Sequence, residues 1–172
     1  MDRPTREQFL KSSKHSVTLP VAVYAALKKA AAEEGLEPYE KIQELVVNYV
    51  ISKRALDPSI QKKIETGRAL IAQAVDIAKK ISSEESFSRS ITLDTFRACV
   101  KDEAWAKAYR EYIEDDIYKH GNPLKSINRE IGFRIRAAIG GEVETGPDGK
   151  AVVAKVSGEV IQSYTPMKSY RQ

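Results

Sequence analysis

A short alternating segment followed by two apolar stretches constrains this chain more than any other feature of its sequence. His15 to Leu19 alternates polar and apolar side chains around Val17, and Pro20 follows. This pattern predicts a short β-strand with one buried face. Because a lone short strand leaves its backbone N–H and C=O groups unpaired, the segment requires a partner strand.

Two helices are predicted directly after this strand. Val21 to Glu34 has helical apolar spacing and ends before Gly35, a residue that readily adopts the left-handed conformation of a helix end. Pro38 suits the first turn of a second helix, which reaches about Lys53. The apolar positions are Val23, Leu27, Ala30, Ala31, Ile42, Leu45, Val46, Tyr49 and Val50. Two short helices cannot bury both stripes against each other alone, so we expect a second copy of the chain to cover them.

Antiparallel pairing of the strands from two copies satisfies both requirements. Val17 and Leu19 then face the four helices. Lys14, Ser16 and Thr18 of both copies lie together on the opposite face. The sequence therefore predicts a homodimer with a polar, partly basic ribbon.

Lys14 to Val50 resembles the ribbon-helix-helix fold of the Arc and MetJ repressors. In that fold a strand ending in proline precedes a helix, a glycine about fifteen residues after the proline, and a second apolar helix. The matching positions are Pro20, Gly35, Ile42, Val46 and Val50. The resemblance implies that the paired ribbon enters the major groove of double-stranded DNA, with Lys14, Ser16 and Thr18 as base-reading residues.

Phosphate contacts are expected from two places. Residues 1–13 form a predicted basic, flexible arm, in a chain of net charge +4. The start of the second helix offers backbone amides and the positive end of the helix, although Glu37 and Pro38 replace the small polar residues usual in the family. The phosphate-binding candidates are Arg3, Arg6, Lys11, Tyr39 and Glu40.

The remainder of the chain predicts a helical domain, residues 58–164, that follows the ribbon-helix-helix domain of residues 14–55 and precedes a tail, residues 165–172. The predicted helices run from Pro58 to about Ile81, from an N-cap at Thr92 to about Val100, from Glu103 to about Tyr118 and from Pro123 to Gly140 or Gly141. A loop, 82–90, separates the first two.

A hairpin is predicted after the last helix. Its strands, 142–145 and 150–156, flank a tight turn at 146–149, and a further strand covers 159–164. Helix, turn, basic helix and hairpin follow the order of a winged helix, which makes Lys125, Arg129 and Arg136 a second DNA-contact candidate. The alternative is an oligomerisation or partner-docking domain with an ordinary solvated basic face.

Catalysis has little support in the sequence. The chain has only two histidines, and no residues have the spacing of a zinc site or of a nucleophile with its base. An acidic cluster, Glu111 with Glu114 to Asp116, is interpreted as a solvated helix end, and the single Cys99 as a core side chain. We expect no enzymatic activity, metal or cofactor. Without an apolar run of about 18 residues or a signal peptide, a cytoplasmic protein is expected.

These observations predict a mainly α protein with little β structure that binds DNA sequence-specifically as a homodimer. The expected role is a transcriptional regulator, such as a repressor, or an accessory factor in plasmid or phage DNA transactions, with higher-order assembly along DNA left open. Two alternatives are an antitoxin-like module, whose C-terminal region masks a toxin, and a structural or assembly protein that uses the ribbon only to dimerise. An adjacent toxin would favour the first, and weak DNA binding without sequence preference the second.

Overall fold

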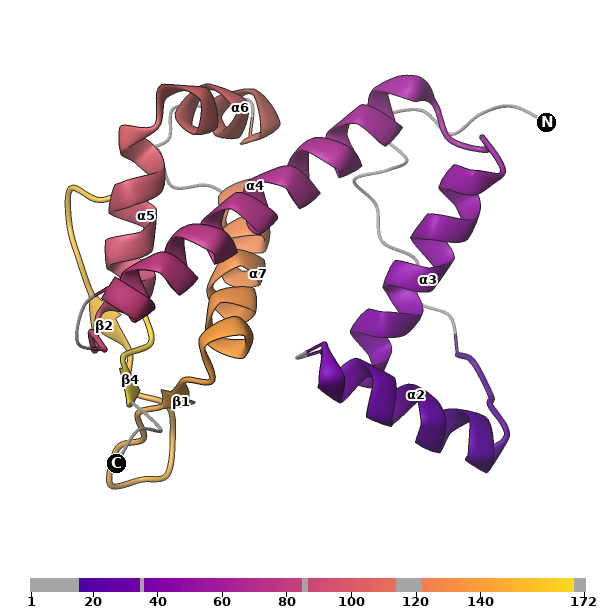
Figure 1. Cartoon of the computed structure of the whole chain (residues 1–172), viewed down its shortest axis with the longest axis horizontal. Coiled ribbons are helices and arrows are strands. Elements are labelled where there is room, and N and C mark those ends of the chain that lie inside the picture. The colour runs from indigo at the N-terminus through magenta and orange to yellow at the C-terminus, as the bar shows by residue number, and fades with distance from the viewer. Residues whose placement is uncertain (1–15, 35, 85–86, 114–121, 169–172) are drawn as a thin grey trace. The chain divides into compact units, whose positions relative to one another are not determined.

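The computed structural model describes residues 16–34, 36–84, 87–113 and 122–168 (Figure 1). This part of the chain is mainly helical with a small amount of antiparallel β structure, as expected. The helices are α2 (Val21–Glu33), α3 (Pro38–Ser52), α4 (Pro58–Glu84), α5 (Ile91–Lys101), α6 (Glu103–Ile113) and α7 (Asn122–Ile139). The chain divides into two compact units, one up to Glu65 and one from Thr66, and the division falls within α4.

In the N-terminal unit, α2 and α3 form the predicted helix–turn–helix arrangement (Figure 1). The Leu36 N–H donates to the Ala31 carbonyl at 2.7 Å and closes the turn. Ala31 and Leu36 are buried, whereas no residue of α3 is. The two helices of one chain therefore enclose only a small core.

The C-terminal unit contains a continuous hydrophobic core built by the second part of α4 with α5, α6 and α7. Trp105 stacks on Tyr109 with ring centroids 4.7 Å apart and meets Phe96 edge-on at 6.4 Å. The Trp105 indole N–H donates to the Leu70 carbonyl at 3.2 Å, so its buried polar atom is satisfied. Residues of α7 that contribute to the core are Ile127, Ile131 and Ile135.

The β structure consists of two antiparallel strand pairs. β1 (Glu142–Val143) pairs with β4 (Met167–Lys168), and β2 (Ala154–Lys155) pairs with β3 (Ser163–Tyr164). The turn at 146–149 is confirmed: the Gly146 N–H donates to the Lys150 carbonyl at 2.8 Å, and Gly149 has a φ of 74°.

The expected hairpin ladder is wrong beyond that turn. Next to the turn, Thr145 pairs with Ala151, and the Val152 N–H donates to the Glu144 carbonyl. The preceding strand, β1, pairs with β4 and not with the second strand of the expected hairpin. The reason is burial of Met167, whose N–H also donates to the Arg89 carbonyl at 3.1 Å. A segment expected to be a tail thus contributes to the core.

The start of α5 also differs from the prediction. Its N-cap is Ser90, and Thr92 lies inside the helix with a buried side chain. The Asp94 carboxylate accepts hydrogen bonds from the Ser88 and Ser90 hydroxyls, each at 2.8 Å, and this cluster fixes the entry to the helix. Within the same helix, the Thr95 hydroxyl donates to the carbonyl of Ile91, four residues earlier, at 2.7 Å.

Candidate nucleic-acid interface

The expected ribbon residues from Ser16 to Leu19 precede α2 and have no strand partner in the described part of the chain. Pro20 has φ −55° and ψ 143°, and its carbonyl accepts the Tyr24 N–H of the first helical turn at 3.0 Å. Ser16 and Thr18 are exposed, and Leu19 is half-buried. Val17, expected to face a core, is 62% exposed in the single chain. The third base-reading candidate, Lys14, and the arm residues Arg3, Arg6 and Lys11 lie outside the described residues.

Apolar side chains cover a broad arc of helix α3. At 3.6 residues per turn, Val47 and Ile51 lie at one edge of this arc, and both are half-buried. The other edge carries Leu45, Val46 and Tyr49, which are 51%, 56% and 62% exposed. We call these three residues the α3 stripe. The half-buried Ile42 and Val50 belong to the same arc. An apolar arc this broad is typical of a helix that packs against more than one partner, and α2 is one partner.

Exposed apolar side chains concentrate in the N-terminal unit. Among the described residues, its large exposed hydrophobics are Val17, Val21, Val23, Tyr24, Tyr39, Leu45, Val46 and Tyr49, whereas the C-terminal unit has Val153 alone. Exposed apolar side chains gathered in one unit of a chain are candidates for an interface. Helical spacing in the sequence identifies part of this surface, but Val21 and Tyr24 lie outside the predicted stripe and only the structure shows their exposure.

Tyr39 and Glu40, at the start of α3, are expected to hold a phosphate. Backbone N–H groups at this helix start already donate to acceptors within the chain. The Glu37 N–H donates to the Glu40 carboxylate at 2.8 Å, and the Glu40 N–H donates to the Glu37 main-chain carbonyl at 3.0 Å, within a capping box formed by these two residues. Pro38 has no N–H to offer. An anion that takes the Glu40 amide must therefore displace an acceptor on Glu37.

The positive charge in the first turns of α3, Lys41, already has partners. The Lys41 ammonium donates to Glu34 at 2.7 Å and to Glu44 at 3.3 Å. The hydrogen bond that Lys41 donates to Glu34 is the main cause that raises the pKa of Lys41, against a smaller opposing effect of desolvation. The α2–α3 turn consequently presents carboxylates around a neutralised lysine.

The second candidate surface lies on α7. Lys125, Arg129 and Arg136 are four and seven residues apart, which places them on one side of the helix. Arg129 is exposed, whereas the Arg136 guanidinium stacks over the Phe133 ring at 4.8 Å. The structure thus aligns the three predicted residues, with one guanidinium held on an aromatic ring; the side chain of Lys125 lies outside the described part.

Two arginines of the C-terminal unit have structural partners. Arg89 pairs with Glu144 at 2.6 Å, and Arg97 pairs with Glu159 at 2.5 Å. The hydrogen bond that each arginine donates to its partner carboxylate is the main cause that raises the pKa of that arginine. These pairs join Arg89, just before α5, and Arg97, within α5, to the segments around the strands. Sequence reasoning missed them because the partners are far apart in the chain.

The described residues contain no group of three or more His, Cys, Asp or Glu side chains that could hold a metal ion. In the same part of the chain, no helix is both long enough and apolar enough to cross a membrane. Comparison of the chain with protein-family models, curated protein sequences and solved structures gives no significant match.

Proposed function

We propose that this protein is a sequence-specific, double-stranded DNA-binding homodimer that reads the major groove through an intermolecular β-ribbon. The observation that carries the proposal is the exposed α3 stripe together with a segment, residues 16–19, that has no pairing strand among the described residues. A second copy supplies what both features lack: a cover for Leu45, Val46 and Tyr49, and a strand to pair with residues 16–19.

Pairing of the two strands also accounts for the alternation of side chains in the segment. Val17 and Leu19 turn toward the helices, and Ser16 and Thr18 turn outward with Lys14. A major groove accommodates a two-stranded ribbon, and lysine, serine and threonine have hydrogen-bond partners on base edges there. The basic arm supplies sequence-independent attraction to phosphates. Such a dimer acts as a transcriptional regulator or as an accessory factor in plasmid or phage DNA transactions.

The base-reading assignment is tested by changing Lys14→Ala and Thr18→Ala together. We expect the double variant to remain dimeric. It should no longer prefer a site that the unmodified protein selects from random duplexes over a scrambled version of that site, since each good base contact discriminates by about 1–3 kcal/mol. Fluorescence anisotropy with both duplexes measures the preference, and light scattering measures the mass of the complex.

A matched control is Lys29→Ala, which removes an exposed lysine of α2 without touching the ribbon. It should weaken both duplexes equally or not at all. A double variant that keeps its full preference would show that other residues read the bases.

One observation favours a second candidate, a structural or assembly protein whose ribbon only dimerises. Glu37 and Glu40 place two carboxylates at the start of α3, and these repel a DNA backbone that approaches there. In this case the protein binds DNA weakly and without sequence preference, so the anisotropy measurement with the unmodified protein separates the two functions.

A further inference from the structure

The connection between α3 and α4 contains an arginine in an unfavourable backbone conformation. Arg54 has a φ of 52°, the only positive φ of a non-glycine residue in the described part of the chain. Its N–H donates to the Ile51 carbonyl at 2.9 Å, and the Ala55 N–H donates to the Val50 carbonyl at 3.2 Å. These bonds are the left-handed termination of a helix, a position that glycine or asparagine occupies at lower cost.

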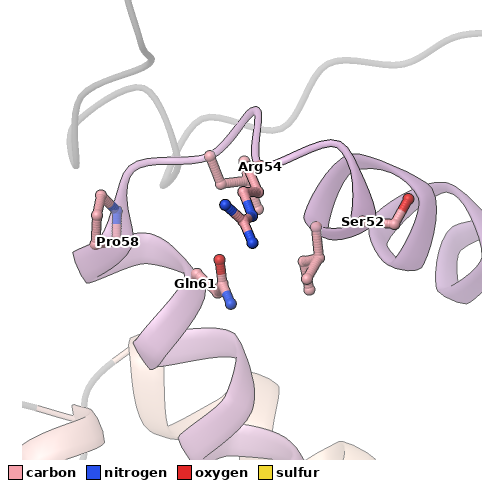
Figure 2. Close-up of a pocket in the computed structure, with 6 residues that line it drawn as sticks. Ser52, Arg54, Pro58 and Gln61 are labelled. Carbon is pink, nitrogen blue, oxygen red and sulfur yellow. The ribbon is translucent and has the colours of Figure 1, made fainter.

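The position of the Arg54 side chain offers a reason for an arginine at this positive φ. Figure 2 shows its guanidinium directed over a hollow between the end of α3 and the first turn of α4, opposite the Gln61 carboxamide. The hollow has a volume of about 470 Å³ and lies wholly within the N-terminal unit. Its lining residues are Ile51, Ser52, Arg54, Leu56, Pro58 and Gln61.

The polar groups around the hollow differ in whether they already have hydrogen-bond partners within the chain. The Ser52 hydroxyl donates to the Tyr49 carbonyl at 2.7 Å, and the Gln61 amide N–H donates to Glu65 at 2.8 Å. No hydrogen bond or ion pair joins the Arg54 guanidinium to another residue of the described ranges. The exposed guanidinium therefore has five donors available for a ligand, and Ile51, Leu56 and Pro58 contribute the apolar part of the lining.

We propose that this hollow binds a small aliphatic carboxylic acid, with the carboxylate on the Arg54 guanidinium and the hydrocarbon against Ile51, Leu56 and Pro58. The planar fork of arginine matches a carboxylate with two parallel hydrogen bonds. The volume lies within the roughly 300–1,000 Å³ of small-molecule sites. Non-glycine residues held at positive φ cluster at ligand sites, which is consistent with an arginine kept where glycine would cost less. This site goes beyond the proposed DNA-binding function and does not depend on it.

The test uses the full-length protein and two probes of the same shape, 4-methylpentanoate and its neutral amide. We expect the acid to shift the NMR signals of the Arg54 side chain and of the Leu56 and Gln61 amides, with a dissociation constant on the order of 1 mM. The amide should bind at least about tenfold more weakly, because it cannot form the charge-assisted pair.

Arg54→Gly separates a structural role from a binding role, because glycine accepts the φ of 52° without strain. The variant should keep or exceed the thermal midpoint that the N-terminal unit has in the unmodified protein, and it should lose at least about tenfold in affinity for the acid. Arg54→Lys should bind the acid with intermediate affinity, since it keeps the charge without the planar fork. Equal binding of acid and amide, or binding that survives in Arg54→Gly, would overturn the proposal, as would the absence of shifts with the acid.

Discussion

At the scale of single residues, burial decides chemistry that sequence alone leaves open. Cys99 is fully buried in the core, and desolvation is the main cause that raises the pKa of its thiol to about 12. The thiolate is the reactive form, so we expect native protein at pH 8 to react with iodoacetamide at least ~100-fold more slowly than the unfolded chain. Mass spectrometry of timed samples, with and without denaturant, measures both rates. Equal rates would show that the thiol is accessible.

The raised pKa of the Cys99 thiol also sets the direction in which pH changes the stability of the fold. The folded-state pKa of Cys99 lies above the ordinary value of 9.0, so the neutral thiol is favoured by folding. Its contribution to stability is present below pH 9.0 and is lost as the pH rises toward about 12.

For single residues, the sequence predicts burial in the core better than it predicts which residue caps a helix. Cys99 was expected in the core and is there. Ser16 and Thr18 are exposed, but so is Val17, so their exposure does not distinguish the two faces of the ribbon. Thr92 was expected to cap a helix and is buried inside it. Serine, threonine and aspartate compete for one cap, and the bonds of Asp94 to Ser88 and Ser90 decide the outcome.

At the scale of elements, the α3 stripe gives the sharpest prediction. Val46→Glu places a charge on a side chain that is 56% exposed in the single chain, so the monomer should tolerate it. In the proposed dimer the same charge is buried in each copy, and we expect the dimer dissociation constant to rise at least ~100-fold. Analytical ultracentrifugation measures this constant.

The matched control for this change is Val153→Glu, at a position of similar exposure in the C-terminal unit, 60%. It should leave the dimer unchanged. If Val46→Glu dimerises as tightly as the unmodified protein, the stripe does not form the subunit contact.

The helices themselves are largely predictable from sequence because their signals are local. Pro38 and Gly140 mark ends that the structure confirms, and Gly140 has the left-handed φ of 64° expected at a helix end. The strand pairings are not predictable in this way. Pairing of Val143 with Met167 joins residues far apart in the chain, and no periodicity encodes which segment lies beside which.

At the scale of the whole molecule, the two units differ in how their cores are completed. The C-terminal unit buries Trp105, Tyr109 and Phe96 within one chain, whereas α3 buries no residue. We therefore expect two thermal transitions, of which only that of the N-terminal unit moves upward with protein concentration. A tenfold rise in concentration favours a dimer by about 1.4 kcal/mol. Calorimetry at two concentrations measures both midpoints, and two concentration-independent transitions would argue against dimerisation through this unit.

Selection of bound fragments tests whether this protein recognises DNA sequence-specifically. Purified protein is mixed with random and genomic duplexes at near-physiological salt, and the retained DNA is sequenced. A dimer that reads through a paired ribbon predicts enrichment of a palindromic or directly repeated motif. Retained DNA with no enriched motif would contradict sequence-specific recognition and leave the ribbon a dimerisation element alone.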